Sequence, residues 1–192
     1  MIYRIKRKNG TADVIDLDVR QLTDKLKPYA PKSLSLMTHL AMLPVNNDKL
    51  SDLWPKTGLQ CLFFKDSKET YQDINAYGSF LVLTQKAYDV VQDSLRNYGE
   101  FLDLDVEGIP MMLFNPLVFG TEDMERSEKE YYDGEEIGIK YLVFDNSTED
   151  KLVFKSKYTA RVCMYCNDEF KELVENHSLQ GLVFEKEINN IF

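Results

Sequence analysis

Apolar positions in the second half of the chain change their spacing in a way that predicts a strand followed by a helix. Residues 80–83 are all apolar, which is typical of a buried strand. Thr84 follows, and apolar residues then recur three or four positions apart as far as Tyr98. This spacing places them on one helical face, and a threonine before that face can accept a hydrogen bond from a free backbone N–H. We predict a helix over about 84–98, ending before Gly99.

A second segment near the end of the chain repeats this plan. Residues 162, 164 and 166 are apolar in alternation, Asn167 occupies the capping position, and three apolar residues between 170 and 174 form a stripe. A short apolar run at 182–184 then follows Gly181. We therefore predict a second helix over about 167–177 and a second strand-helix-strand unit.

Four further segments have the composition of strands and are separated by turn residues. They are residues 101–106, 111–115, 139–145 and 152–155. We predict an α+β fold with a mixed or mainly antiparallel sheet and two clear helices.

The N-terminal portion is harder to assign. Residues 2–8 and 12–19 flank Asn9-Gly10, a strong hairpin signal that would place Ile5 opposite Val14. Residues 20–79 contain four prolines, so we predict a loop-rich segment there, with one helical face shared by Leu22 and Leu26 and a short helix within 34–43. We expect residues 1–77 to pack as a hairpin and an irregular segment on a main domain of residues 78–192.

Composition limits the functional classes. The chain has 192 residues, 44% of them hydrophobic, which suits one folded domain, and a net charge of −9, which disfavours binding to nucleic acid or to an anionic membrane. The first eight residues are cationic, but Asn9-Gly10 follows them in place of an apolar stretch, so we do not expect a signal peptide. The apolar run at 36–45 is too short to cross a bilayer. We expect a cytoplasmic protein.

The residues that most often carry chemistry are few. Cys163 and Cys166 form a single C-x-x-C pair on a predicted strand, where an odd offset points the thiols to opposite faces, so we expect no metal or redox site. His177 is expected at the C-terminal end of its helix, and His39 in an apolar run. No nucleotide-binding, hydrolase or metalloprotease motif occurs, and we predict no catalytic residue.

An acidic segment stands out as the candidate binding surface. Residues 122–136 hold eight acidic and two basic residues, a net charge of −6, with two tyrosines among them. A solvated charged loop is the simpler interpretation, but aromatic rings within charge of one sign suit a protein-binding surface for a basic partner. The candidate partner-binding residues are Glu122, Asp123, Glu125, Glu128, Glu130, Tyr131, Tyr132, Glu135 and Glu136.

Six short motifs, taken in order, resemble a known family. They are Gly78–Ala87, Leu113–Pro116, Thr121–Ser127, Lys140–Asp145, Asn167–Phe170 and Gly181–Glu185. Together they resemble immunity protein family eleven of bacterial polymorphic toxin systems, first catalogued as a domain of unknown function, over roughly residues 78–187. The chain departs from the family pattern at the two caps, where Thr84-Gln85 stands in place of Ser-Glu and Asn167 in place of serine.

The resemblance implies a small cytoplasmic bacterial protein that neutralises a cognate toxin by direct stoichiometric binding, without turnover and without a cofactor. Two alternatives belong to other classes: a small-molecule or sugar-modifying enzyme that uses unidentified carboxylates, and an acidic regulator that mimics nucleic acid. The first and last predict stoichiometric protein binding, whereas the enzyme does not. The oligomeric state and the chemistry of the toxin are open at this level.

Overall fold

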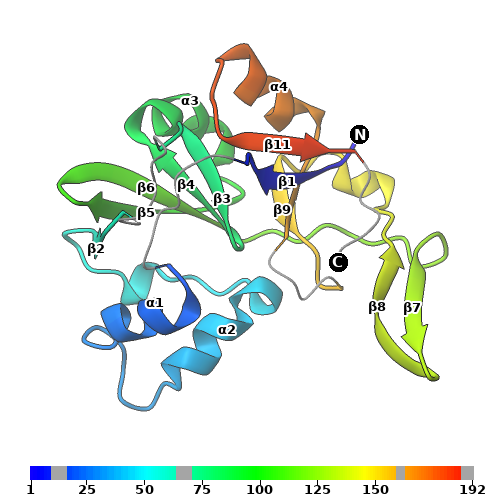
Figure 1. Ribbon diagram of the computed structural model, residues 1–192, viewed down its shortest axis with the longest axis horizontal. Helices are drawn as coiled ribbons and strands as arrows, with labels where there is room; N and C mark the ends of the chain where they lie inside the picture. The colour runs from blue at the N-terminus through cyan, green and yellow to red at the C-terminus, as the bar shows by residue number, and fades with distance from the viewer. Residues whose placement is uncertain (10–16, 64–70, 159–162, 187–192) are drawn as a thin grey trace.

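The computed structural model describes residues 1–9, 17–63, 71–158 and 163–186 (Figure 1). The helices in these ranges are α1 (Val19–Leu26), α2 (Leu36–Asn46), α3 (Gln85–Leu95), α4 (Asp168–Asn176) and the short 3₁₀ helices η1 (Ser51–Leu53) and η2 (Asn146–Thr148). The strands are β1 (Tyr3–Arg7), β2 (Leu59–Cys61), β3 (Ile74–Tyr77), β4 (Phe80–Thr84), β5 (Gly99–Val106), β6 (Ile109–Pro116), β7 (Glu128–Tyr132), β8 (Glu135–Tyr141), β9 (Val153–Lys155), β10 (Met164–Cys166) and β11 (Leu182–Glu185).

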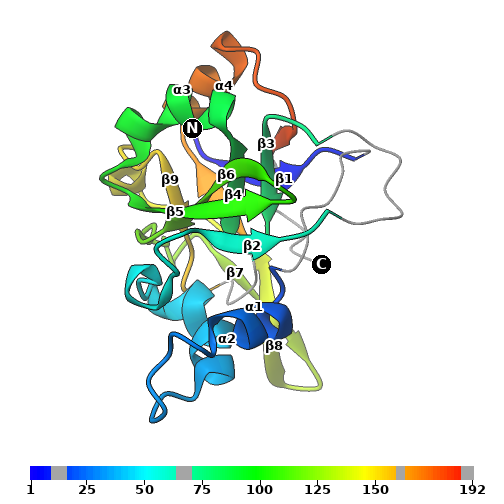
Figure 2. The same ribbon diagram turned by 90° about the vertical axis from the view of Figure 1, so that its left-hand side faces the viewer.

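A five-stranded sheet in the order β2-β5-β6-β4-β3 forms the centre of the molecule, antiparallel except for the parallel pair β2–β5. Alternating side chains of β4 enter two cores, because successive residues of a strand point to opposite faces. Phe80 and Val82 pack with α1 and α2, whereas Leu81 and Leu83 pack with α3 and α4. Figure 2 shows the two helix pairs on opposite sides of this sheet. The predicted α+β fold is confirmed.

A second sheet joins the two ends of the chain in the order β11-β1-β10-β9, entirely antiparallel. Ile5 of β1 lies between Met164 and Phe184, so both edges of the strand are already paired at this position. The predicted hairpin is therefore wrong at Ile5, and its expected partner Val14 lies outside the described residues. A local turn preference was outweighed by the burial of Ile5 in a core built from distant segments.

The two predicted strand-helix-strand units are confirmed, with one feature that the sequence pattern did not reveal. β4 and β5 both pair antiparallel with β6, so they run parallel to each other with β6 between them. In the same way, β10 and β11 run parallel with β1 between them. Each unit is thus a β-α-β crossover split by an intervening strand. The first helix ends at Leu95, earlier than expected, and Gly99 opens β5.

Gly181 holds the two sheets together where they meet. Its carbonyl accepts a hydrogen bond from Lys8 N at 2.8 Å, while the preceding Gln180 carbonyl accepts one from Ile74 N at 3.0 Å. The φ of Gly181 is +123°, and a Cβ at this position would collide with the carbonyl oxygen of Ile74. A glycine is therefore required for β3 of the first sheet to approach the turn before β11 of the second.

The N-terminal portion contains more regular structure than predicted. Leu22 and Leu26 do share the buried face of α1, as their spacing indicated. The expected short helix is α2, which continues through Pro44 in its last turn. A proline this close to a helix end removes a single interior hydrogen bond, so the helix is not broken there. α1 and α2 cover one face of the five-stranded sheet.

The two caps generate a stability prediction. Asn167 Oδ1 accepts a hydrogen bond from Phe170 N at 3.0 Å, and its Nδ2 donates one to Glu149 O at 2.8 Å. The cap at Thr84 is weaker, with 3.4 Å to Ala87 N. We expect Asn167→Ala to lower the free energy of unfolding by about 2 kcal/mol and Thr84→Ala by about 1 kcal/mol.

Urea unfolding followed by circular dichroism measures both effects. Asn176→Ala, at an exposed position of α4, is the matched control and should change the midpoint little. If Asn167→Ala unfolds at the same urea concentration as the parent protein, the cap does not stabilise α4.

Candidate functional site

Most of the predicted binding residues belong to a two-stranded hairpin that extends away from both larger sheets (Figure 1). β7 and β8 pair antiparallel and are joined by Asp133 and Gly134, whose φ values are +49° and +84°. Positive φ at both turn residues defines a type I′ turn, for which Asp-Gly is a preferred sequence. The sequence contains this Asp-Gly signal, although the prediction of a binding surface rests on the charge of Asp133 and its neighbours and not on this turn.

The base of the hairpin is packed firmly on the four-stranded sheet. Ile139, Leu142 and Phe144 are buried and form a core with Phe154 and Tyr165 from β9 and β10. The Phe144 ring lies 5.1 Å from that of Phe154 and 5.0 Å from that of Tyr165, in edge-to-face arrangements. Such ring pairs add to the burial of apolar surface, so the hairpin is fixed at its base.

Two of the predicted binding residues serve this framework. Glu122 Oε1 accepts hydrogen bonds from Ser156 Oγ at 2.6 Å and Lys157 N at 3.0 Å. Asp123 Oδ1 accepts from two backbone N–H groups of the following turn, and its Oδ2 accepts from Arg126 Nε at 2.5 Å. The Arg126 guanidinium holds the pKa of Asp123 below its usual value. These carboxylates hold the segment that leads into the hairpin.

The tip of the hairpin presents the aromatic residues to solvent. Tyr131 is 60% exposed and Tyr132 is 74% exposed. Glu135 beside the turn is exposed, and so is Glu125 before β7. The structure thus places both tyrosines near the tip, at successive positions of β7 whose side chains point to opposite faces of the ribbon, apart from Glu122 and Asp123. Ile137, 47% exposed, lies on the same hairpin and was not predicted as a binding residue.

The remaining acidic residues differ in their surroundings. Glu128 forms an ion pair of 2.7 Å with Lys140 across the two strands, and this hydrogen bond raises the pKa of Lys140. Glu130 Oε2 is buried without a hydrogen-bond partner among the described residues. Glu136 pairs with Tyr131 in the backbone register, but its side chain lies outside the part that the structure describes.

A buried polar cluster around Lys155 is the other unusual chemical feature. Lys155 is 1% exposed, and its Nζ donates a 3.3 Å hydrogen bond to Leu43 O in the last turn of α2. Burial lowers the pKa of Lys155 to about 8, while Asp48 and Glu100 partly oppose this shift. Glu100 itself accepts hydrogen bonds from Leu50 N at 2.6 Å and from Asn115 Nδ2 at 2.9 Å. The cluster joins α2 and η1 to the sheets and is a structural junction.

The cysteines and histidines lie where their sequence positions suggested. Cys163 packs in the core beneath the hairpin and Cys166 in the core beneath α4, so the two thiols face opposite sides of β10. Burial raises the pKa of Cys166 far above its usual value. His177 ends α4, and His39 lies 3.5 Å from Asp48. Within the described ranges, no three His, Cys, Asp or Glu side chains are grouped as metal ligands.

A scan against protein-family models and a search of curated proteins both return no match to this chain. In the part of the chain that the structure describes, no helix has the length and apolar character needed to cross a membrane.

The buried lysine generates a pH-dependent prediction. Its pKa is about 8 in the folded protein against 10.5 in the reference state, so the unfolded chain binds more protons between these two values. Stability should therefore rise between pH 8 and pH 10.5 as the folded lysine loses its proton. Below pH 8 the buried charge lowers the free energy of unfolding by on the order of 3 kcal/mol. Lys155→Met removes this cost but also loses the hydrogen bond to Leu43 O, which contributes about 1 kcal/mol.

We therefore expect Lys155→Met to be more stable than the parent protein at pH 7 by roughly 2 kcal/mol and to lose the alkaline rise. Urea unfolding at a series of pH values measures this, and Lys49→Met, at an exposed position, is the control. A destabilised Lys155→Met at pH 7 would show that the Leu43 hydrogen bond and the attraction of Asp48 and Glu100 outweigh the cost of burying the charge.

Proposed function

We propose that this protein is an immunity protein that neutralises a cognate bacterial toxin by stoichiometric binding through the β7–β8 hairpin. The observation that carries the proposal is the exposure of Tyr131 and Tyr132, side by side in the chain, at the tip of a projecting acidic hairpin. The resemblance of residues 78–187 to an immunity family supports the same conclusion from the sequence.

The two kinds of side chain on the hairpin have different roles in such binding. Tyrosine rings give a large contact area at a small cost in side-chain entropy, and they dominate the affinity when a partner surrounds them. Carboxylates attract a basic partner from a distance and accelerate its association. The hairpin between residues 128 and 141 holds five acidic residues and two lysines, so its partner is a protein with a basic surface.

The construction of the hairpin supports inhibition by occlusion. Its base is held by the core around Phe144, so its tip can enter a cleft of the toxin without rearrangement of the sheets. A pre-organised element loses little conformational entropy on binding, and this favours tight association. In the proposed mechanism the bound hairpin blocks entry to the cleft of the toxin. Inhibition of this kind requires neither turnover nor a cofactor.

Protection from the toxin is the direct test. The candidate toxin is the product of the neighbouring open reading frame, expressed under a tightly controlled promoter in a susceptible bacterium. We expect the parent protein to restore growth and the double variant Tyr131→Ala/Tyr132→Ala to lose protection, because both ring anchors are removed. Tyr29→Ala, which removes a tyrosine that is 51% exposed on another surface, should protect fully.

The same variants should be compared in a pull-down with the purified toxin candidate, with circular dichroism to confirm folding. Protection by the double variant at equal protein levels would refute the hairpin as the inhibitory element. Absence of both protection and binding by the parent protein would refute toxin immunity with this partner and would favour an acidic regulator of another basic protein.

Binding kinetics distinguish the contribution of the acidic residues, which acts on the association rate, from that of the tyrosine rings, which acts on the dissociation rate. Glu128→Lys/Glu135→Lys should slow association with the basic toxin by roughly tenfold at low salt, with a smaller effect at high salt, because exposed charges are screened. Tyr132→Ala should instead accelerate dissociation, with a loss of about 2 kcal/mol if this ring is an anchor.

Surface plasmon resonance at two ionic strengths measures both rates. Glu172→Lys/Asp150→Lys makes the same change in net charge away from the hairpin and should leave association nearly unchanged. Equal slowing by the two charge-reversal pairs would show that net charge, and not the hairpin, attracts the partner.

A further inference from the structure

The β7–β8 hairpin has two faces, and the register of its strands assigns each side chain to one of them. Successive residues of a strand point to opposite faces, so Glu128, Glu130 and Tyr132 of β7 share one face. Residues that are directly paired in an antiparallel ribbon also share a face. This adds Tyr141, which pairs with Glu128, and Glu135, which pairs with Tyr132. We call the surface formed by these five residues the Tyr132 face.

The surroundings of Lys140 support this assignment. Its Nζ forms the 2.7 Å ion pair with Glu128, and the hydrogen bond to Glu128 and the charge of Glu130 both raise its pKa. The strand register shifts next to Glu128, and at such a bulge two successive residues of one strand lie opposite a single residue of the other. Lys140 and Tyr141 can therefore both lie beside Glu128, and Lys140 belongs to the Tyr132 face.

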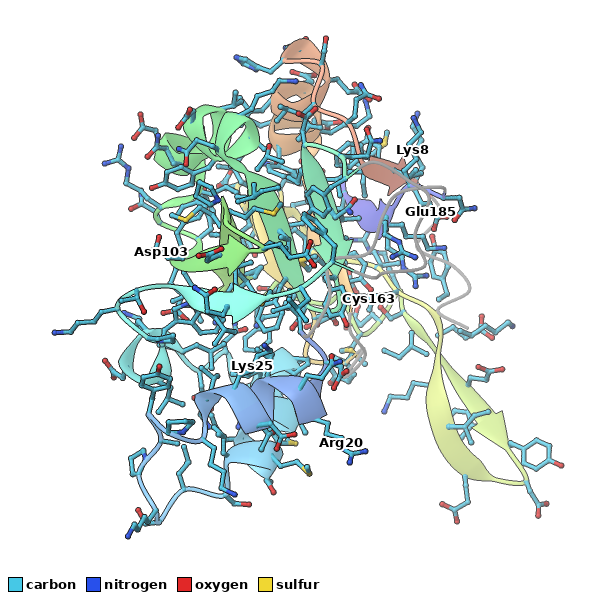
Figure 3. The ribbon with its side chains drawn as sticks, turned by 60° about the vertical axis from the view of Figure 1, so that its left-hand side comes forward. Lys8, Arg20, Lys25, Asp103, Cys163 and Glu185 are labelled. Atoms are coloured by element: carbon cyan, nitrogen blue, oxygen red, sulfur yellow. The ribbon has the colours of Figure 1, made fainter. Side chains whose placement is uncertain are left out.

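The opposite face of the hairpin is open to a partner only near the tip. Lys129 and Tyr131 point to this side, and Ile139, which pairs with Lys129, is buried in the core around Phe144. Figure 3 shows the outer half of the hairpin extending clear of the other elements. A partner can therefore surround both tyrosines at the tip, but toward the base it can follow only the Tyr132 face.

The Tyr132 face has an exposed aromatic ring at each end. Tyr132 lies beside the turn, whereas Tyr141, which is 42% exposed, lies at the base. The four residues between Tyr132 and Glu128 correspond to about 13 Å of extended strand, so the two rings bound a narrow strip of this length. Tyr141 also forms part of the wall of a surface hollow of about 450 Å³. Its ring is therefore accessible to a partner that follows the strip.

The charge of this strip is negative at the residues that form it. Glu128 and Lys140 are paired with each other, which leaves Glu130 and Glu135 as the charges available to a partner. One oxygen of Glu130, Oε2, is shielded from solvent and accepts no hydrogen bond within the described ranges. Charge-assisted hydrogen bonds are stronger than neutral ones, so a Lys or Arg N–H is the group that this carboxylate binds best.

We propose that an extended basic segment of the toxin lies along the Tyr132 face and contacts the hairpin from its tip to Tyr141. This inference rests on the proposed toxin binding and specifies its contact surface. A Lys or Arg of the segment binds Glu130, and neighbouring side chains pack on the rings of Tyr132 and Tyr141, whose faces also attract cations. Tyr141 is thus a further contact residue, outside the acidic segment 122–136 that the sequence indicated.

Isothermal titration calorimetry with the purified toxin candidate tests this surface. Tyr141→Ala should raise the dissociation constant at least about tenfold, whereas Tyr141→Phe, which keeps the ring, should change it less than about threefold. Glu130→Gln should raise the dissociation constant by about three- to tenfold, because the charge is lost from a hydrogen bond that the toxin makes. Tyr29→Ala is the matched control and should bind like the parent protein, and circular dichroism confirms that each variant is folded.

Photo-crosslinking separates direct contact from an indirect effect of the substitution. A benzophenone amino acid is incorporated at position 141 or, as the control, at position 29, and the complex with the toxin candidate is irradiated. We expect a crosslink to the toxin from position 141 and none from position 29.

Equal affinity of Tyr141→Ala and the parent protein, without a crosslink from position 141, would overturn the proposal and confine the contact to the tip. The double variant Tyr131→Ala/Tyr132→Ala would still lose binding in that case, so the proposed toxin immunity would stand. Absence of binding by the parent protein would instead refute both proposals for this partner.

Discussion

The pairing of β1 with both β10 and β11 is the constraint on which the rest of the structure depends. The first strand of the chain fills the gap between two strands near its end and buries Tyr3 and Ile5 against α4. The Tyr3 hydroxyl donates a 2.8 Å hydrogen bond to Asp168 in the first turn of α4, which raises the pKa of Tyr3 to about 12. These contacts join segments far apart in the sequence, so the loop-closure entropy that they cost is larger than for contacts within one hairpin or helix.

The hairpin depends on the same sheet but is not part of it. Phe154 and Tyr165 extend from β9 and β10 on the face opposite α4 and form the core on which the hairpin base packs. The β7–β8 pair then continues beyond this core, where backbone pairing, the Asp133-Gly134 turn and the Glu128–Lys140 ion pair hold it. Loss of the β1 pairing would therefore weaken the hairpin base, whereas substitutions at the tip leave the core untouched.

How far the sequence predicts this structure depends on the distance over which each signal acts. Thr84 and Asn167 cap their helices through residues three positions away, and both helices were predicted. Ile5 is placed by strands at the other end of the chain, which no local pattern reports. The same limit applies to the site. Glu122 was predicted to bind a partner, but it holds the framework through Ser156 and Lys157, which are too distant in the sequence for a local pattern to reveal. The two exposed tyrosines could be identified from the sequence, because the acidic residues that indicate a charged surface are their direct neighbours in the chain.

The proposed toxin complex depends on the two ends of the hairpin in different ways. The base is fixed by the ring contacts of Phe144 with Phe154 and Tyr165, so its position does not depend on the tip. The tip carries the exposed rings of Tyr131 and Tyr132, and substitutions there change the contact area offered to a partner without removing buried apolar surface. Affinity for the proposed partner can therefore change at the tip while the base maintains the fold.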